Sequence, residues 1–130
     1  MFSSVKMLNI NGKKADDQDV VVNFVNGQIS ITPKSGGAPI ASLGYNTIVK
    51  ATYVHAKTPA YDPTLSSVPP EGLELPGGLF GRPTRHWLVL QTKTEYRILR
   101  LEDANFGKIL ETIEARTGRK VDRPAGDKGE

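Results

Sequence analysis

The 130-residue sequence lacks several features that would assign a protein quickly. It contains no cysteine, which excludes a disulfide framework and a cysteine nucleophile. Its apolar runs are short, as in Trp87–Leu90, so a transmembrane helix is excluded. Residues 1–8 lack the apolar stretch of a signal peptide, and we therefore expect a cytoplasmic protein. A chain of this length buries roughly two thirds of its unfolded surface and needs no metal to hold a core.

The charge is nearly balanced and aromatic residues are scarce. The 17 Lys and Arg residues face 14 Asp and Glu residues, and aromatic residues make up 7% of the chain. The basic residues are spread out, with denser groups only at 82–85 and 116–123. Nucleic-acid-binding domains usually carry a denser basic face with exposed aromatic side chains. The composition therefore gives no strong signal for a nucleic-acid partner.

Two β-hairpins are the clearest local signals. Val20–Val25 and Gln28–Thr32 flank the dipeptide Asn26-Gly27. Both turn residues accept positive φ at low cost, which predicts a type I′ turn. His86–Gln91 and Glu95–Leu101 have the same alternating, β-branched character and predict a second hairpin.

Weaker signals surround these hairpins. Pro39–Leu43 and Thr47–Ala56 each predict a strand. The start of the chain, residues 1–19, is ambiguous: Val5–Ile10 could form an additional strand and Asn11–Gln18 a polar loop.

One amphipathic helix is expected near the C-terminus. Its apolar stripe follows the spacing i, i+3, i+4, i+7 and comprises Phe106, Ile109, Leu110 and Ile113. Asp103 is the expected N-cap, and Gly118 is the expected left-handed C-terminal stop. We expect a single domain over residues 1–121 and a disordered tail over residues 122–130.

Residues 57–85 have a different composition from the rest of the chain. The stretch contains six prolines, at positions 59, 63, 69, 70, 76 and 83, and shows neither a helical nor a strand period. Loops this long inside a domain are uncommon and are usually functional or mobile. Leu73, Leu75, Leu79 and Phe80 are too apolar for a fully solvated linker. We therefore expect part of this loop to pack somewhere in the fold.

These observations predict a mainly β fold with one C-terminal helix. Six or seven strands in successive hairpins are expected to precede the helix. The order of elements, with HWLVLQTKTEYRILRLEDANFGKILETIEARTGRKV as the last hairpin and helix, resembles the pleckstrin-homology-like (PH-like) superfold. That resemblance implies a strongly bent antiparallel sheet, closed into a partly open barrel of six or seven strands, whose final helix plugs one open end.

The resemblance does not extend to lipid recognition. Phosphoinositide-binding members of that superfold carry a basic signature across the first hairpin. Here Lys13 and Lys14 are followed by Asp16, Asp17 and Asp19, which cancel the local positive field. Phosphoinositide binding is therefore not expected.

The sequence offers few candidates for catalysis or metal binding. Its two histidines, His55 and His86, stand at the end of one expected strand and the start of another. Tyr53, Tyr61, Asp62 and Glu71 could join them in a two-histidine, one-carboxylate site. We favour the simpler interpretation that both histidines are strand-end residues, and we expect no catalytic residue, metal or cofactor.

The favoured function is therefore a non-catalytic interaction module rather than an enzyme. Such a module would recognise a protein or peptide through the long loop and a strand edge. The candidate partner-binding residues are Tyr61, Leu79, Phe80, Arg82 and Arg85. The alternatives are peripheral membrane or lipid binding, with Leu79 and Phe80 as an apolar wedge, and a small enzyme with its site under the 57–85 loop. The oligomeric state stays open.

Overall fold

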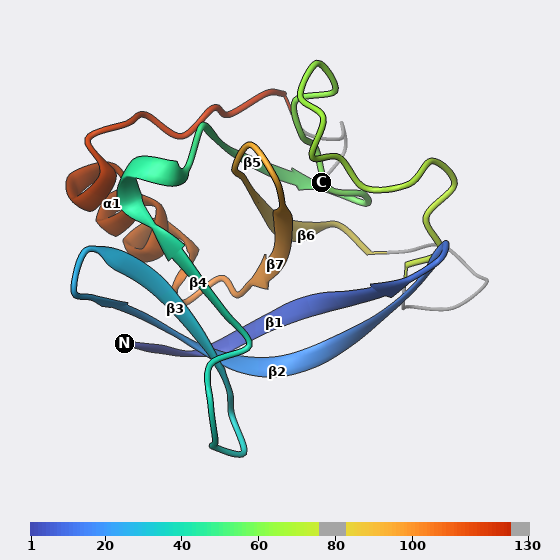
Figure 1. Ribbon diagram of the computed structural model, residues 1–130. Helices are drawn as coiled ribbons and strands as arrows, with labels where there is room; N and C mark the ends of the chain where they lie inside the picture. The colour runs from blue at the N-terminus through green and yellow to red at the C-terminus, as the bar shows by residue number, and fades with distance from the viewer. Residues whose placement is uncertain (76–82, 126–130) are drawn as a thin grey trace.

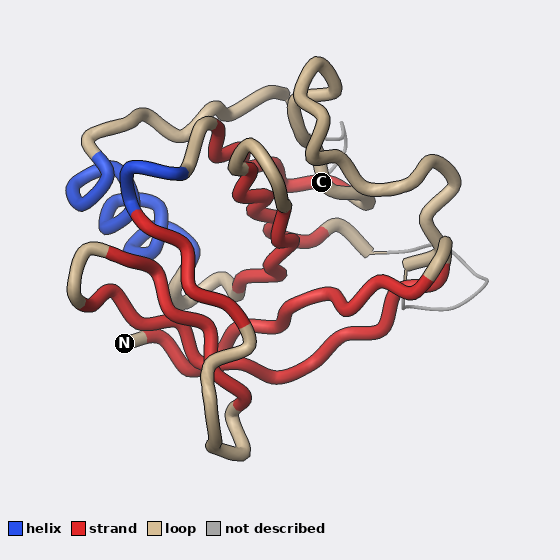
Figure 2. Tube along the Cα trace, viewed as in Figure 1, coloured by secondary structure: helices blue, strands red, loops and turns tan. Residues whose placement is uncertain are grey.

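The computed structural model describes residues 1–75 and 83–125. Within them the protein is mainly β, with seven antiparallel strands forming a half-barrel and one C-terminal helix, as the sequence predicts (Figures 1 and 2). The strands are β1 (Phe2–Asn11), β2 (Lys14–Val25), β3 (Gln28–Pro33), β4 (Ala41–Gly44), β5 (Lys50–Ala56), β6 (Arg85–Gln91) and β7 (Tyr96–Leu101). A short 3-10 helix, η1 (Tyr45–Thr47), precedes β5, and the α-helix is α1 (Phe106–Thr117).

The strand order in the sheet is β4-β3-β2-β1-β7-β6-β5. Two groups of hairpins are thus joined where β1 meets β7, through the pairs Lys6↔Arg100 and Met7↔Leu99. Beyond Met7, β1 continues paired with β2 as far as Asn11↔Lys14. This part of the β1–β2 hairpin extends away from β7 as a long arm (Figure 1).

The inner core lies between the sheet and α1. Leu88 and Leu90 of β6 face it, together with Leu99 and Leu101 of β7. The α1 side chains that complete this core are Ile109, Leu110 and Ile113, which are 0–1% exposed. The helical stripe expected from the sequence is therefore the face that docks on the half-barrel.

An outer core occupies the opposite face of β5, β6 and β7. Side chains alternate across a strand, so Trp87 and Val89 point away from Leu88 and Leu90. They pack with Leu8 and Ala15 of the β1–β2 arm and with Leu75. Strands β5–β7 are thus covered on both faces. α1 covers one face, and the arm together with the loop after β5, which contains Leu75, covers the other.

The expected Asn26-Gly27 turn is confirmed. Both residues have positive φ, 53° and 75°, as a type I′ turn requires. Gly118 also ends α1 as expected, with φ 71° and its N–H donating to the Glu114 carbonyl.

Two local predictions are wrong. Residues 14–18 belong to β2 rather than to a polar loop, because β1 pairs with them and Ala15 is buried in the outer core. Asp103 is not the N-cap of α1, since that position belongs to Asn105. The Asp103 carboxylate instead accepts a hydrogen bond from a histidine, described below.

The segment after α1 returns to the sheet. Asp122 forms a parallel bridge with Thr52 at the outer edge of β5, and its backbone bonds to Ala51 and Tyr53 are both 2.8 Å long. Val121 is 5% exposed and belongs to the inner core. The tail expected to be disordered from residue 122 is therefore held at its first residue.

Candidate functional site

The outer loop, residues 57–75, is anchored to the sheet by one buried side chain. Gln91 is fully buried, and its amide faces the same side of β6 as Trp87 and Val89. Its Oε1 accepts from the Asp62 N–H at 2.9 Å, while its Nε2 donates to the carbonyls of Asp62 at 3.2 Å and Ser67 at 2.9 Å. By satisfying three backbone groups of the loop, the buried Gln91 amide fixes the loop to β6.

Further contacts hold the two ends of the outer loop. The Trp87 indole N–H donates to the Ala56 carbonyl at 3.1 Å, where the loop begins. Near its other end, Glu74 pairs with the arm through backbone bonds to Lys13 and Ala15 of 2.6 and 3.0 Å. The loop is therefore fastened at its start, its middle and its end.

The anchored loop lines an open pocket of about 300 Å³, which we call the outer pocket. Most of its wall is proline, tyrosine and leucine, and the lining residues are Thr58, Pro59, Tyr61, Pro69, Pro70, Glu71, Gly72, Leu73 and Leu75. Tyr61, Leu73 and Leu75 also pack on the outer core. A mainly apolar pocket with few polar groups is the usual form of a binding site.

Of the described residues that line the outer pocket, one is charged, Glu71. Glu71 is exposed, and within the described residues its carboxylate makes no hydrogen bond or ion pair. Lys13 of the arm is not part of the lining but lies next to Gly72. A Cβ atom placed on Gly72 would be 3.9 Å from the Lys13 Nζ. Among the ion pairs of the described residues, none joins Lys13 to Glu71.

Only two of the five predicted partner-binding residues can be placed. Tyr61 lines the outer pocket. Arg85 lines a separate polar cavity of about 150 Å³ beside His55 and His86. Leu79, Phe80 and Arg82 lie outside the described residues, so the structure does not bring the five together.

The two histidines form the second candidate site. They are paired across β5 and β6, and their rings stack with centroids 4.4 Å apart. The Phe106 ring covers the other face of His86 at 4.0 Å. Both ring nitrogens of His86 are engaged at 2.6 Å, Nδ1 with the Tyr53 hydroxyl and Nε2 with the Asp103 carboxylate.

This arrangement fixes the tautomer of a neutral His86. The Tyr53 hydroxyl donates to Nδ1, and Nε2–H donates to Asp103, so both nitrogens are satisfied. Among the described residues no group of three His, Asp or Glu side chains could hold a metal ion. The cluster therefore links β5, β6 and the turn before α1, and this role needs no charge on the imidazole.

Tyr61, Asp62 and Glu71, which the disfavoured two-histidine, one-carboxylate alternative grouped with the histidines, lie apart from them. His86 and Gln91 stand at opposite ends of β6 and point to opposite faces of the sheet. Asp62 is hydrogen-bonded to Gln91, and Glu71 lines the outer pocket with Tyr61. Their positions in the sequence allowed this grouping, but the alternation of side chains along β6 places the histidines and the outer loop on opposite faces of the sheet.

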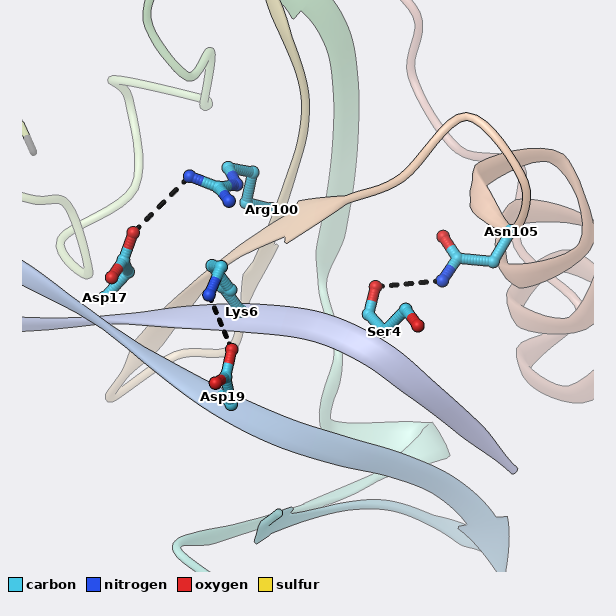
Figure 3. A network of polar contacts seen from close by, with 6 residues as sticks. All are labelled: Ser4, Lys6, Asp17, Asp19, Arg100 and Asn105. Atoms are coloured by element: carbon cyan, nitrogen blue, oxygen red, sulfur yellow. Dashed lines mark hydrogen bonds and ion pairs between the residues drawn. The ribbon is translucent and has the colours of Figure 1, made fainter. Parts of the chain in front are cut away.

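Two acidic residues of β2, Asp17 and Asp19, are paired with basic residues, as Figure 3 shows. Lys6 Nζ lies 2.6 Å from Asp19, and Arg100 lies 3.4 Å from Asp17. The hydrogen bond and charge of Lys6 lower the pKa of Asp19 below its ordinary value. Asn105 donates to the Ser4 carbonyl at 2.9 Å and ties the start of α1 to β1.

Neither a known protein-family model nor a curated protein matches this sequence. In the parts of the chain that the structure describes, every helix is too short or too polar to span a membrane. The half-barrel with its C-terminal helix is compatible with a PH-like fold.

Proposed function

We propose that this protein is a PH-like, non-catalytic recognition module that binds an extended protein segment at the outer pocket. The observation that carries the proposal is a pocket of about 300 Å³ whose loop is already fastened to the sheet. A loop ordered before binding avoids most of the entropy cost of ordering on contact.

The lining supports a side chain of a peptide as the ligand. Prolines and Tyr61 offer rigid apolar surface, and such surfaces lose little conformational freedom when they are covered. Gln91 does not line the pocket, and it acts on the pocket by holding Asp62 and Ser67 of the same loop to β6.

Selection from a phage-displayed library of random linear peptides tests the proposal on the full-length chain. We expect selected peptides to lose at least about fivefold in affinity for Tyr61→Ser, since a central aromatic contact contributes more than about 1 kcal/mol. Because Tyr61 also packs on the outer core, a second variant is needed. Thr58→Trp places bulk at an exposed position of the lining and should block the pocket without disturbing that core.

Thr94→Trp is the matched control. Thr94 is exposed in the β6–β7 turn and lines a different cavity. Circular dichroism must first show that all three variants fold. Selected peptides that bind Thr58→Trp as tightly as the unmodified protein would contradict the proposal.

A further inference from the structure

We infer that the outer pocket selects a basic side chain, arginine or lysine, in the extended segment it binds. The inference rests on the proposed function and names the chemistry of its ligand. It follows from two features of the lining, an apolar wall and a single carboxylate without a partner among the described residues.

The apolar wall fits the stem of a long basic side chain. Arginine and lysine carry three or four methylene groups, which pack on apolar surface while the charged head stays near water. Pro59, Pro69 and Pro70 form such a surface together with Tyr61. The pocket volume of about 300 Å³ is large enough for one side chain of that length.

The carboxylate supplies the selectivity. Among the described residues that line the pocket, Glu71 alone is charged, and its side chain is exposed. An acidic ligand side chain would face this charge without compensation, and an aliphatic one would leave it unpaired. A cationic head is the ligand group that completes the site.

Lys13 is one cation of the chain itself that lies close to the pocket lining. It stands beside Gly72 and does not enter the lining, and no ion pair joins it to Glu71 in the described residues. Because the Lys13 ammonium would repel a cationic ligand head, removing its charge should strengthen binding of a basic ligand. Lys13→Gln tests the direction of this effect independently of Glu71.

The test uses capped peptides Ala-Pro-Xaa-Pro-Ala in which Xaa is Arg, Lys, norleucine or Glu. Binding to the full-length protein is followed through amide NMR shifts of residues around the pocket. We expect the Arg and Lys peptides to bind about two- to fivefold more tightly than the norleucine peptide, the range for a partly exposed ion pair. The Glu peptide should bind more weakly than norleucine. Added salt should reduce the difference between Arg and norleucine.

Glu71→Gln should lower the affinity of the Arg peptide to that of norleucine and leave norleucine unchanged. Glu111→Gln, at an exposed position of α1, is the control and should change neither. Equal binding of Arg and norleucine, both lost on Thr58→Trp, would overturn this inference and leave the proposed function standing. Shifts for no peptide at the pocket residues would overturn the proposed function and the inference with it.

Discussion

Single residues decide where the candidate site lies, and several of them are polar residues inside strands. Gln91 and His86 are both buried, at 0% and 8% exposure, and each satisfies groups from other elements. Buried polar side chains are retained where they have partners, because an unpaired one costs about 1–3 kcal/mol. The sequence carries a signal for Gln91, since it shares strand parity with Trp87 and Val89. It carries none for the loop groups that Gln91 would meet.

Asp62 gives the outer loop a dependence on pH. The hydroxyl and the N–H of Thr64 donate to its carboxylate at 2.6 and 2.9 Å, and these bonds lower the pKa of Asp62 below the ordinary 3.8. A lowered pKa in the folded state means that the ionised form favours folding. This contribution is complete above the ordinary pKa and is lost as pH falls through the lowered value.

Thr64→Val should therefore raise the pKa of Asp62 toward 3.8, because it removes the hydroxyl donor, the larger of the two causes. Carboxyl NMR titration of both proteins measures the change. Thr112→Val on α1, whose hydroxyl bonds to the Lys108 carbonyl, is the control and should leave Asp62 unchanged. An Asp62 pKa that is the same with and without the Thr64 hydroxyl would refute this description of the loop.

At the scale of elements, alternation and turn chemistry predict the hairpins and α1 well. The Asn26-Gly27 turn, the helical stripe and the Gly118 stop depend on local residues, and local residues suffice to predict them. The start of β2 cannot be predicted from local residues alone, because Asp16 and Asp17 are typical loop residues and are held in a strand by pairing with β1. The N-cap assignment failed for a related reason. Asp103 is positioned by His86, which is 17 residues away in the sequence.

The outer loop is the element whose position depends most on one contact. Gln91→Leu keeps an apolar side chain in the outer core but leaves backbone groups of Asp62 and Ser67 without their buried partner. We expect the free energy of unfolding to fall by about 2–4 kcal/mol. Amide hydrogen exchange should accelerate in residues 60–68 more than in β2 and β3.

Gln18→Leu is the matched control for that change. Gln18 lies on β2, and its side chain accepts only an exposed bond from Asn9. It should change stability by less than about 0.5 kcal/mol. If exchange in the loop were the same in Gln91→Leu as in the unmodified chain, the anchoring role of Gln91 would be wrong.

At the scale of the whole molecule, strands β5–β7 are shared by two cores. The inner core and α1 close the half-barrel, while the outer core supports the loop that forms the outer pocket. The sequence predicts the order of the strands along the chain and the single α-helix, and it predicts that part of the 57–85 loop packs. It does not predict which face receives that loop, because the choice depends on the β1–β2 arm folding over Trp87 and Val89.

The central claim is that ligand recognition occurs on the outer face, at the outer pocket, and not at the histidine cluster on the inner face. Amide chemical-shift mapping of a selected peptide on the full-length protein tests this most directly. We predict that the largest shifts fall on Tyr61, Glu71, Gly72 and Leu73, with His55 and Asp103 unchanged. Largest shifts at His55, Arg85 and Asp103 instead would place binding at the polar cavity of the inner face and contradict the account.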